Sequence, residues 1–334
     1  MNNKRSLILI LDMLAGHWVE DSESPVTRLP YPNVKGYEKA GLLPNFGDCM
    51  KNGIYANAWN NGNCNTPYGQ KYLASGTYQT ESASAIDPYW SMVRGLDKET
   101  ILQACKRTYP GGKVASFGSD AWMQTGWWKA HDCTMGWGSY YSDFLTSQNA
   151  FHWMMGNPDW NMVLLYLAQY DMTGNCPVYT EGAAYTKDKH HSLLQLDRFL
   201  WMVKTFLKEQ GWWDDTYLFI GSDHGCHVGC NIAIEEGRER GVAETDLSNY
   251  CSNHQAPYDC YSWDFENNRA MDKRSDCCRR TTFIVTGGAL PREQYGKAVD
   301  NAEIIDFAPT IAEAMDIDFI ADGKSILASG PKRF

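Results

Sequence analysis

The fold of this chain is decided by the stretch Thr216-Tyr217-Leu218-Phe219-Ile220-Gly221-Ser222-Asp223-His224-Gly225. It begins as an uncharged, largely apolar run, which is typical of a strand buried on both faces in a parallel sheet. In open α/β sheets, ligands bind beyond the carboxyl ends of the strands. An Asp-His pair at that position can offer a carboxylate oxygen and an imidazole nitrogen to one metal ion. An isolated Asp-His-Gly sequence is more often a polar turn, so the rest of the chain must support a site.

Two other apolar runs end in a carboxylate in the same way. Ser6 to Leu11 is followed by Asp12, and Met162 to Tyr170 is followed by Asp171. Because the carboxyl ends of parallel strands meet at one edge of a sheet, we expect Asp12, Asp171 and Asp223 to lie close together.

The remaining periodic segments complete an α/β pattern. Residues 54–59 and 282–286 read as strands, and residues 45–52 as a short helix. Between 187 and 210, leucines and a valine recur at steps of three and four residues, which predicts a long amphipathic helix ending at Gly211. The sequence therefore predicts a mostly parallel central sheet flanked by helices on both faces, in one domain spanning residues 1–334.

Two segments fit this pattern poorly and are predicted to be insertions. Residues 86–158 are expected to form a cap of helices and loops over one end of the sheet. They carry a tryptophan cluster that packs internally or lines a substrate pocket: Trp122, Trp127, Trp128, Trp137 and Trp153. Residues 226–278 are polar and cysteine-rich, and are expected to form a second insertion.

The chain has eleven cysteines, an odd number without regular spacing. Six of them gather near His227 and His254, namely Cys226, Cys230, Cys251, Cys260, Cys277 and Cys278. Free thiols are the ordinary interpretation of such a set, and a structural zinc site or disulfides are the alternatives.

Composition narrows the classes of partner. The 334 residues are 43% hydrophobic and carry a formal net charge of -10. An acidic surface repels phosphate polymers and anionic membranes, so we expect neither a nucleic acid nor a membrane partner. The first apolar run stops at Asp12, too early for a signal-peptide core or a membrane span, which predicts a cytoplasmic protein. The sequence does not indicate an oligomeric state.

A candidate nucleophile stands at the start of another predicted helix. The polar loop 60–65 runs into Thr66-Pro67, where threonine suits a helix N-terminus and proline the first helical position. Helix N-termini favour anions and an ionised hydroxyl. A Thr-Pro helix start alone is usually only a cap.

The stretch from Thr66 through Ser75-Gly76-Thr77-Tyr78 to Ser82 resembles the nucleophile helix of the alkaline phosphatase superfamily, closest to its type I phosphodiesterase/nucleotide pyrophosphatase branch. The C-terminal stretch 304–315 and Asp322-Gly323-Lys324-Ser325 resemble a structural element of sulfatases and phosphodiesterases. These motifs occur along the chain in the same order as in the family, and together they span residues 7 to 326. A threonine nucleophile argues against a sulfatase, whose branch uses a modified Cys or Ser, and Cys64 lacks the sulfatase sequence context.

The resemblance implies two metal sites. Asp12, Asp223 and His224 fall at the ligands of the first, beside Thr66. The family binds a second metal through Asp and His of an Asp-x-x-Gly-His motif, where this chain has Asp171 and, instead of the histidine, Asn175. The family's last metal-binding histidine has no obvious equivalent, and His254 is the nearest upstream candidate, followed by His227.

The metal is expected to be Zn or Mn, with Mg or Ca as alternatives. One site should be tight and the second weak, empty or rebuilt from Asp171, Asn175 and His254, because an amide oxygen is a poor zinc ligand.

These features together imply a metal-dependent phosphoric-ester hydrolase of phosphodiesterase or phosphatase type. Thr66 would attack a small phosphorylated substrate and form a phospho-threonine intermediate, which water then hydrolyses. Two alternatives stay open at this point. One is a transferase or mutase that moves the phospho-group to an alcohol, and the other is a binding protein that kept the fold with weakened catalysis.

Overall fold

The alternating burial of the first strand sets the layers of the molecule. In β1 (Arg5–Leu11), Leu7, Leu9 and Leu11 enter one hydrophobic cluster, while Ile8 and Ile10 enter another on the opposite face. All five side chains are fully buried. Successive side chains of a strand point to opposite faces, so a strand that is apolar at every position must be covered on both sides.

The computed structural model describes residues 4–14, 34–39, 41–80, 96–120, 128–136, 142–175, 182–245, 247 and 250–327. Within these residues, the central sheet has eight strands in the order β10-β2-β9-β6-β1-β5-β3-β4. The strands other than β1 are β2 (Ile54–Trp59), β3 (Lys113–Gly118), β4 (Cys133–Gly136), β5 (Trp160–Leu167), β6 (Thr216–Gly221), β9 (Arg280–Thr286) and β10 (Lys297–Glu303).

All neighbouring pairs in this sheet are parallel except those made by β9, which runs antiparallel to both β2 and β6. In the register of the central strands, Ile10 of β1 lies opposite Gly221 of β6 and Tyr166 of β5. The carboxyl ends of β1, β5 and β6 therefore share one edge of the sheet, as the sequence predicts.

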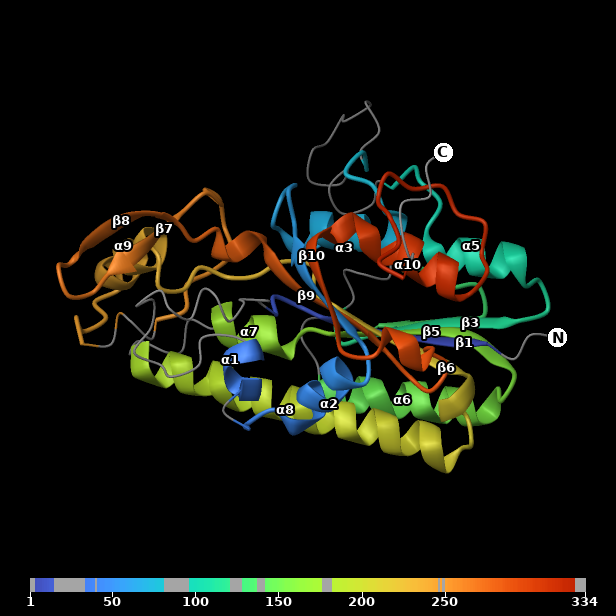
Figure 1. Ribbon diagram of the computed structural model, residues 1–334. Coiled ribbons are helices and arrows are strands. Elements are labelled where there is room, and N and C mark those ends of the chain that lie inside the picture. Colours follow the sequence, from blue (N-terminus) through green and yellow to red (C-terminus); the bar gives the residue numbers. More distant parts are fainter. Residues whose placement is uncertain are drawn as a thin grey trace.

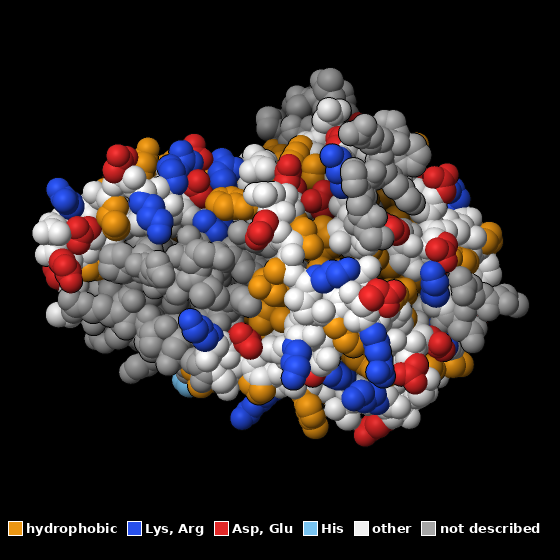
Figure 2. Space-filling model, in the orientation of Figure 1, with side chains coloured by type: hydrophobic (Ala, Val, Ile, Leu, Met, Phe, Trp, Pro, Cys, Tyr) orange, Lys and Arg blue, Asp and Glu red, His pale blue; other side chains and the backbone are white. Residues whose placement is uncertain are grey.

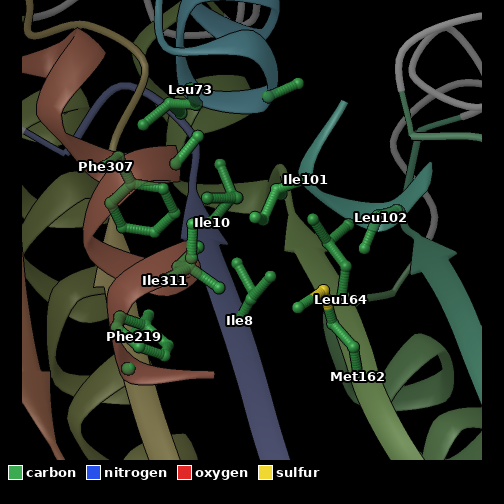
Figure 3. Packing of buried hydrophobic residues seen from close by; sticks show 14 of the residues in the cluster. Ile8, Ile10, Leu73, Ile101, Leu102, Met162, Leu164, Phe219, Phe307 and Ile311 are labelled. Atoms are coloured by element: carbon green, nitrogen blue, oxygen red, sulfur yellow. The ribbon is translucent and has the colours of Figure 1, made fainter. Parts of the chain in front are cut away.

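Helices cover both faces of the sheet (Figure 1). One face carries α3 (Thr66–Ser75), α5 (Ile101–Thr108) and α10 (Phe307–Ala314). The other carries α2 (Pro44–Lys51), α6 (Asp143–Gly156) and α8 (Gly182–Glu209), with α1 (Val34–Lys39) and α7 (Gln169–Asn175) nearby. Figure 3 shows the first face, where Leu73, Ile101 and Ile311 of the helices meet Ile8, Ile10 and Leu164 of the sheet. The predicted fold class, a mostly parallel sheet with helices on both faces, is confirmed.

The prediction that residues 86–158 form a cap is wrong for most of the residues in this range that the structure describes. Residues 113–118 and 133–136 form β3 and β4 of the central sheet, and α5 and α6 pack on its two faces. Sequence analysis misses β3 because Lys-Val-Ala-Ser-Phe-Gly is short and contains small polar residues, although five of its six positions are buried. Residues 81–95, 121–127 and 137–141 lie outside the described part of the chain.

The predicted strand 162–170 also needs correction, because β5 ends at Leu167 and α7 begins at Gln169. The backbone N–H groups of Ala168 and Gln169 donate to the buried Asp143 carboxylate, at 3.0 and 3.4 Å, instead of extending the ladder. Asp171 consequently lies in the first turn of a helix rather than directly after a strand.

Residues 226–279, here called the cysteine lobe, leave the sheet after β6 and return to it at β9. The lobe contains α9 (Asn231–Glu239) and a two-stranded antiparallel sheet of β7 (Tyr261–Asp264) and β8 (Arg269–Arg274), and has a hydrophobic cluster of its own. In Figure 1 it extends from one end of the central sheet. Four 3₁₀ turns complete the described elements: η3 (Trp213–Asp215), η5 (Cys277–Arg279), η6 (Arg292–Gln294) and η7 (Ile304–Asp306).

Two findings concern the helices and the surface of the described residues. Within the described residues, no helix combines the length and apolar character needed to cross a membrane. Figure 2 shows basic and acidic side chains interspersed over the described surface of the face in view.

Candidate active site

Thr66 is the first residue of α3 and points its hydroxyl at the end of β6. Its Oγ1 lies 3.0 Å from His224 Nε2, and the side chain is half-buried. Asn65, the N-cap residue, is extended and makes no capping hydrogen bond with its side chain. The positive end of the helix dipole is therefore turned toward Thr66 without a side-chain cap, as suits a site for an anion.

The His224 ring is oriented by the backbone. Its Nδ1 lies 3.0 Å from the carbonyl oxygen of Gly225, which can only accept, so Nδ1 carries the proton. In the neutral imidazole, Nε2 then has a lone pair on the side of the ring that faces Thr66 Oγ1. The same Nε2 is 3.5 Å from Asp12 Oδ1 and 3.4 Å from Asp223 Oδ2.

Asp223 is held by three donors and its position is fixed. Its Oδ1 accepts from the backbone N–H groups of Met13 and His224, at 3.1 and 3.0 Å, and its Oδ2 accepts from Gln70 Nε2 at 2.9 Å. Gly69 lets α3 approach this closely, because a Cβ there would lie 2.5 Å from the carbonyl oxygen of Asp223. Helix α3 and Asp223 are thus in direct contact.

Only one of the two carboxylate oxygens of Asp12 has a hydrogen-bond partner among the described residues. Tyr166 donates its hydroxyl to Asp12 Oδ2, whereas Oδ1 is buried and has no hydrogen-bond partner among the described residues. Burial raises the pKa of Asp12 well above its usual range, and the carboxylates of Asp223 and Asp171 raise it further. Burial likewise raises the pKa of Asp223. Carboxylates gathered in a buried space call for a compensating positive charge.

A divalent metal ion fits this arrangement. One ligand atom each from Asp12, Asp223 and His224 lies within 4.8 Å of the other two, and all three side chains are buried. Asp12 Oδ1, which has no hydrogen-bond partner among the described residues, and the lone pair of His224 Nε2 can serve as metal ligands. Zinc and manganese bind carboxylate oxygens and imidazole nitrogens of this kind. The three residues predicted for the first metal site are therefore together, with Thr66 beside them.

Asp171 and His254 lie next to this cluster. His254 Nε2 is 3.9 Å from Asp171 Oδ1, and the rings of His254 and His224 are stacked with centroids 4.0 Å apart. His254 Nδ1 contacts the carbonyl oxygen of Cys64 at 3.1 Å, so its Nε2 is also available as a ligand. Burial, followed by the charge of His224, lowers the pKa of His254 to about 4, which keeps the imidazole neutral at ordinary pH.

Asn175, the other residue predicted for the second site, is the last residue of α7, and its side chain lies outside the described part of the structure, so its role as a ligand stays a prediction. His227, the second candidate for the missing histidine, points elsewhere, with Nε2 2.9 Å from the carbonyl oxygen of Gln255.

Sequence analysis missed the side chains that hold the ligands in place. Gln70 links Asp223 to Trp128, whose indole N–H donates to Gln70 Oε1 at 2.8 Å. Gln70 lies four residues after Thr66, on the same face of the helix, and this spacing is the signal that would have indicated it. For Trp128 and Tyr166 the sequence gives no local signal, because their partners are distant in the chain.

Two tryptophans of the predicted cluster support the packing interpretation. Trp128 is fully buried, and Trp153 packs on Phe117. Trp122, Trp127 and Trp137 lie outside the described residues.

The cysteine lobe holds the loop that precedes Thr66. Arg279 Nη1 donates to the carbonyl oxygens of Asn60 and Gly62, both at 3.1 Å, and the Tyr258 hydroxyl donates to Asn63 Oδ1 at 2.6 Å. At its other end α3 is fastened by the C-terminal element, because the N–H groups of Asp322 and Gly323 donate to the Gly76 carbonyl at 3.0 Å.

This geometry places a threonine hydroxyl at a helix N-terminus beside a buried cluster of two carboxylates and an imidazole, on an α/β sheet. No protein-family model matches the chain, and no curated protein matches its sequence. Solved structures with the same fold are numerous.

Three of these structures are representative. Murine ectonucleotide pyrophosphatase/phosphodiesterase 5, in an inactive variant in complex with AMP, is 13% identical, with 96% of this chain and 97% of that chain covered and a TM-score of 0.56. A 2-O GAG sulfatase is 14% identical over 97% of this chain and 73% of its own, with a TM-score of 0.62. The lipoteichoic acid synthase LtaP from Listeria monocytogenes is 13% identical, with 98% of this chain and 75% of that chain covered and a TM-score of 0.61. The chain thus shares its fold with these phosphodiesterase, sulfatase and lipoteichoic acid synthase structures, and this is the fold that the resemblance of its motifs implies.

Proposed function

We propose that this chain is a metal-dependent hydrolase of phosphoric esters, of the phosphodiesterase type, with Thr66 as its nucleophile. The observation that carries the proposal is the 3.0 Å contact between Thr66 Oγ1 and His224 Nε2, at a helix N-terminus and beside the buried carboxylates of Asp12 and Asp223. The substrate is a small phosphorylated molecule, since its negative charge complements the helix terminus and a bound cation.

A divalent ion bound by Asp12, Asp223 and His224 would favour the ionised form of Thr66 and balance the charge of the phosphoryl oxygens. Thr66 Oγ1, having released its proton to solvent, forms the bond to phosphorus. The leaving group departs with the electron pair of the broken phosphorus–oxygen bond and takes a proton from water to become the alcohol. Water then attacks phosphorus and breaks its bond to Thr66 Oγ1, which regains a proton as the phosphate product leaves. Gln70 and Tyr166 keep the two carboxylates in position throughout.

Two observations favour phosphoryl over sulfuryl transfer. Cys64, the nearest cysteine in sequence, is fully buried with Sγ 3.8 Å from the Asn60 carbonyl oxygen, and burial raises the pKa of its thiol to about 12. Such a thiol is a poor nucleophile. Among the structural neighbours, the murine phosphodiesterase is described as inactive in the variant that replaces a threonine by alanine.

The test is hydrolysis of nitrophenyl phosphate monoesters and diesters by metal-free protein and after addition of Zn²⁺ or Mn²⁺. We expect metal-dependent turnover, faster with the diester, and a phosphate on Thr66 when the reaction is quenched in acid and analysed by mass spectrometry. No turnover with any metal would leave a binding protein with this fold. Transfer of the phospho-group to an added alcohol, in preference to water, would indicate the transferase alternative.

A further inference from the structure

The cysteine lobe contains a second cluster of metal-binding side chains, apart from the candidate active site. His227, Cys230, Cys260 and Cys277 are all fully buried, and one ligand atom from each lies within 4.8 Å of the other three. They come from three separate stretches: the loop after β6, the residue before β7, and the first residue of η5. Residues so far apart in the chain meet only because the lobe folds around them.

The distances within the cluster are those of a tetrahedral site. Zinc bonds of about 2.3 Å to sulfur and about 2.0 Å to nitrogen give tetrahedral edges of about 3.8 Å between two sulfurs and about 3.6 Å between sulfur and nitrogen. In the lobe, His227 Nδ1 is 3.6 Å from Cys230 Sγ and 3.8 Å from Cys277 Sγ, and the sulfurs of Cys260 and Cys277 are 3.4 Å apart. Little rearrangement is needed to place an ion at the centre.

The imidazole is oriented for metal binding. His227 Nε2 lies 2.9 Å from the carbonyl oxygen of Gln255, which accepts its proton, so the unprotonated Nδ1 faces the three sulfurs. A metal-binding histidine typically donates its other ring N–H to a carbonyl or carboxylate in this way. An imidazole packed for its apolar surface alone has no need to direct a lone pair at three thiols.

A disulfide accounts for the cluster less well. A bond between Cys260 and Cys277 would leave the thiol of Cys230 and the imidazole of His227 buried together without a function. The lobe's hydrophobic cluster is also small, and three of the four residues belong to it. Small structural units with little apolar core are commonly stabilised by a bound metal.

We propose that His227, Cys230, Cys260 and Cys277 bind a structural zinc ion. Binding displaces three thiol protons, so the site holds three thiolates, one neutral imidazole and Zn²⁺, with a net charge of -1. Four protein ligands close the coordination sphere, as is typical of structural rather than catalytic zinc.

The proposed ion also fixes residues of the candidate active site. Gln255, which accepts from His227, directly follows His254 in the chain, and the N–H of Gly225 donates to the carbonyl of Cys278 at 2.8 Å. Arg279, two residues after Cys277, holds the loop before Thr66. The site therefore joins the lobe to the segments that carry His224, His254 and the nucleophile.

Cobalt substitution distinguishes this site from the active site, because only thiolate ligands give a strong sulfur-to-cobalt charge-transfer absorption. The full-length protein, purified under reducing conditions and freed of metal, is titrated with Co²⁺. We expect this absorption, with tetrahedral ligand-field bands, to reach the intensity of one thiolate-bound Co²⁺ per chain, and excess Zn²⁺ to abolish both. Cys277→Ser should lose the charge-transfer intensity and one zinc equivalent. Cys251→Ser, at a buried cysteine of the same lobe outside the cluster, should retain both. Asp12→Asn, which alters the candidate active site, should retain the charge-transfer intensity.

X-ray absorption of the zinc-containing wild type keeps the test independent of any variant that fails to fold. Sulfur neighbours at about 2.3 Å from zinc are expected beside the oxygen and nitrogen neighbours of a zinc ion at Asp12, Asp223 and His224. The proposal is overturned if folded, reduced wild type gives no charge-transfer band, if zinc shows only oxygen and nitrogen neighbours, or if Cys260 and Cys277 form a disulfide in the native protein.

Discussion

Thr66 and His224, separated by 158 positions in the chain, lie with Oγ1 and Nε2 only 3.0 Å apart. The contact depends on the topology, because β6 delivers His224 to the sheet edge and α3 begins at the same edge. The backbone fixes both partners, His224 through the Gly225 carbonyl and Thr66 through its position as the first residue of α3.

Replacing Thr66 by alanine should lower kcat/KM for phosphate esters by several orders of magnitude without loss of structure or bound metal, because the nucleophile itself is removed. Thr66→Ser, which keeps a hydroxyl, should retain part of the activity. Steady-state kinetics with circular dichroism and metal analysis checks this. A suitable control is Ser75→Ala at the far end of α3, roughly 13 Å away along the helix axis. Undiminished turnover in Thr66→Ala would exclude this residue as the nucleophile and direct attention to Ser75, Thr77 and Thr80.

The two halves of the active site should differ in metal affinity. The first offers Asp12, Asp223 and His224, whereas the second offers Asp171 and His254 among the described residues, with Asn175 where the family has histidine. We expect one tight zinc at the first half and a weaker, harder ion such as Mn²⁺ at the second.

Titration of metal-free protein with Zn²⁺ or Mn²⁺ measures these affinities. Together with the proposed structural zinc, it should count two tight zinc ions per chain, of which Asp12→Asn removes one. Asn175→His should raise zinc occupancy of the second half. Three equally tight zinc ions in the wild type would contradict the expected asymmetry.

Gly69→Ala should impair catalysis without touching a reacting group. A Cβ at this position would lie 2.5 Å from the Asp223 carbonyl oxygen and 2.8 Å from Asp223 Cβ, so α3 must move away from the metal ligands and carry Thr66 with it. Displacement by about 1 Å can reduce a rate by roughly 100-fold, and overpacking costs about 1–3 kcal/mol of stability. Gly156→Ala is the matched control, since a Cβ there meets nothing within 4 Å. Equal kinetics for the two variants would show that the close approach is unimportant.

Asp143 should make stability depend on pH. Burial raises the pKa of this carboxyl to about 7, against about 3.9 in an unfolded chain. Between these values the folded state binds the proton more tightly, so the free energy of unfolding falls as pH rises, by at most roughly 1.4 kcal/mol per pH unit.

Asp143→Asn removes this ionisation and keeps an acceptor for Ser119 Oγ and the Ala168 N–H. Relative to wild type, the variant should therefore gain up to roughly 3 kcal/mol in unfolding free energy between pH 5 and pH 7. Urea unfolding of both proteins across this range measures the difference. Parallel stability curves would mean that Asp143 stays ionised in the folded protein.

The residues nearest the chemistry were predictable because each follows an element with a strong local signal. Asp12 and Asp223 follow fully buried strands, and Thr66 begins a helix marked by proline and a polar loop. From the sequence, His254 is only one of two candidates for the family's last metal-binding histidine, with His227 the next, because the segment around them has no periodicity.

The sequence failed where structure depends on distant partners. Asp171 was expected directly after a strand, but the Asp143 carboxylate ends β5 early by accepting from the backbone beyond Leu167. The short β3 was overlooked because Ser116 and Gly118 weaken its apolar pattern, although the residue between them, Phe117, is buried in the core. Tyr166 and Trp128 support the site through single contacts that no local pattern encodes.

The antiparallel direction of β9 has a consequence for how such a protein can diversify. Gly221, the last residue of β6, pairs with Phe283 of β9, and the next N–H, of Ser222, donates to Thr282 at 3.0 Å. The chain therefore leaves and re-enters the sheet at the same edge, and the intervening lobe can lengthen, shorten or be exchanged without shifting the register of any strand. Because that edge is also where Thr66 and the carboxylates gather, each such exchange alters the surroundings of the candidate active site while the strand register stays constant. Selectivity can thus evolve in the lobe largely independently of the stability of the sheet.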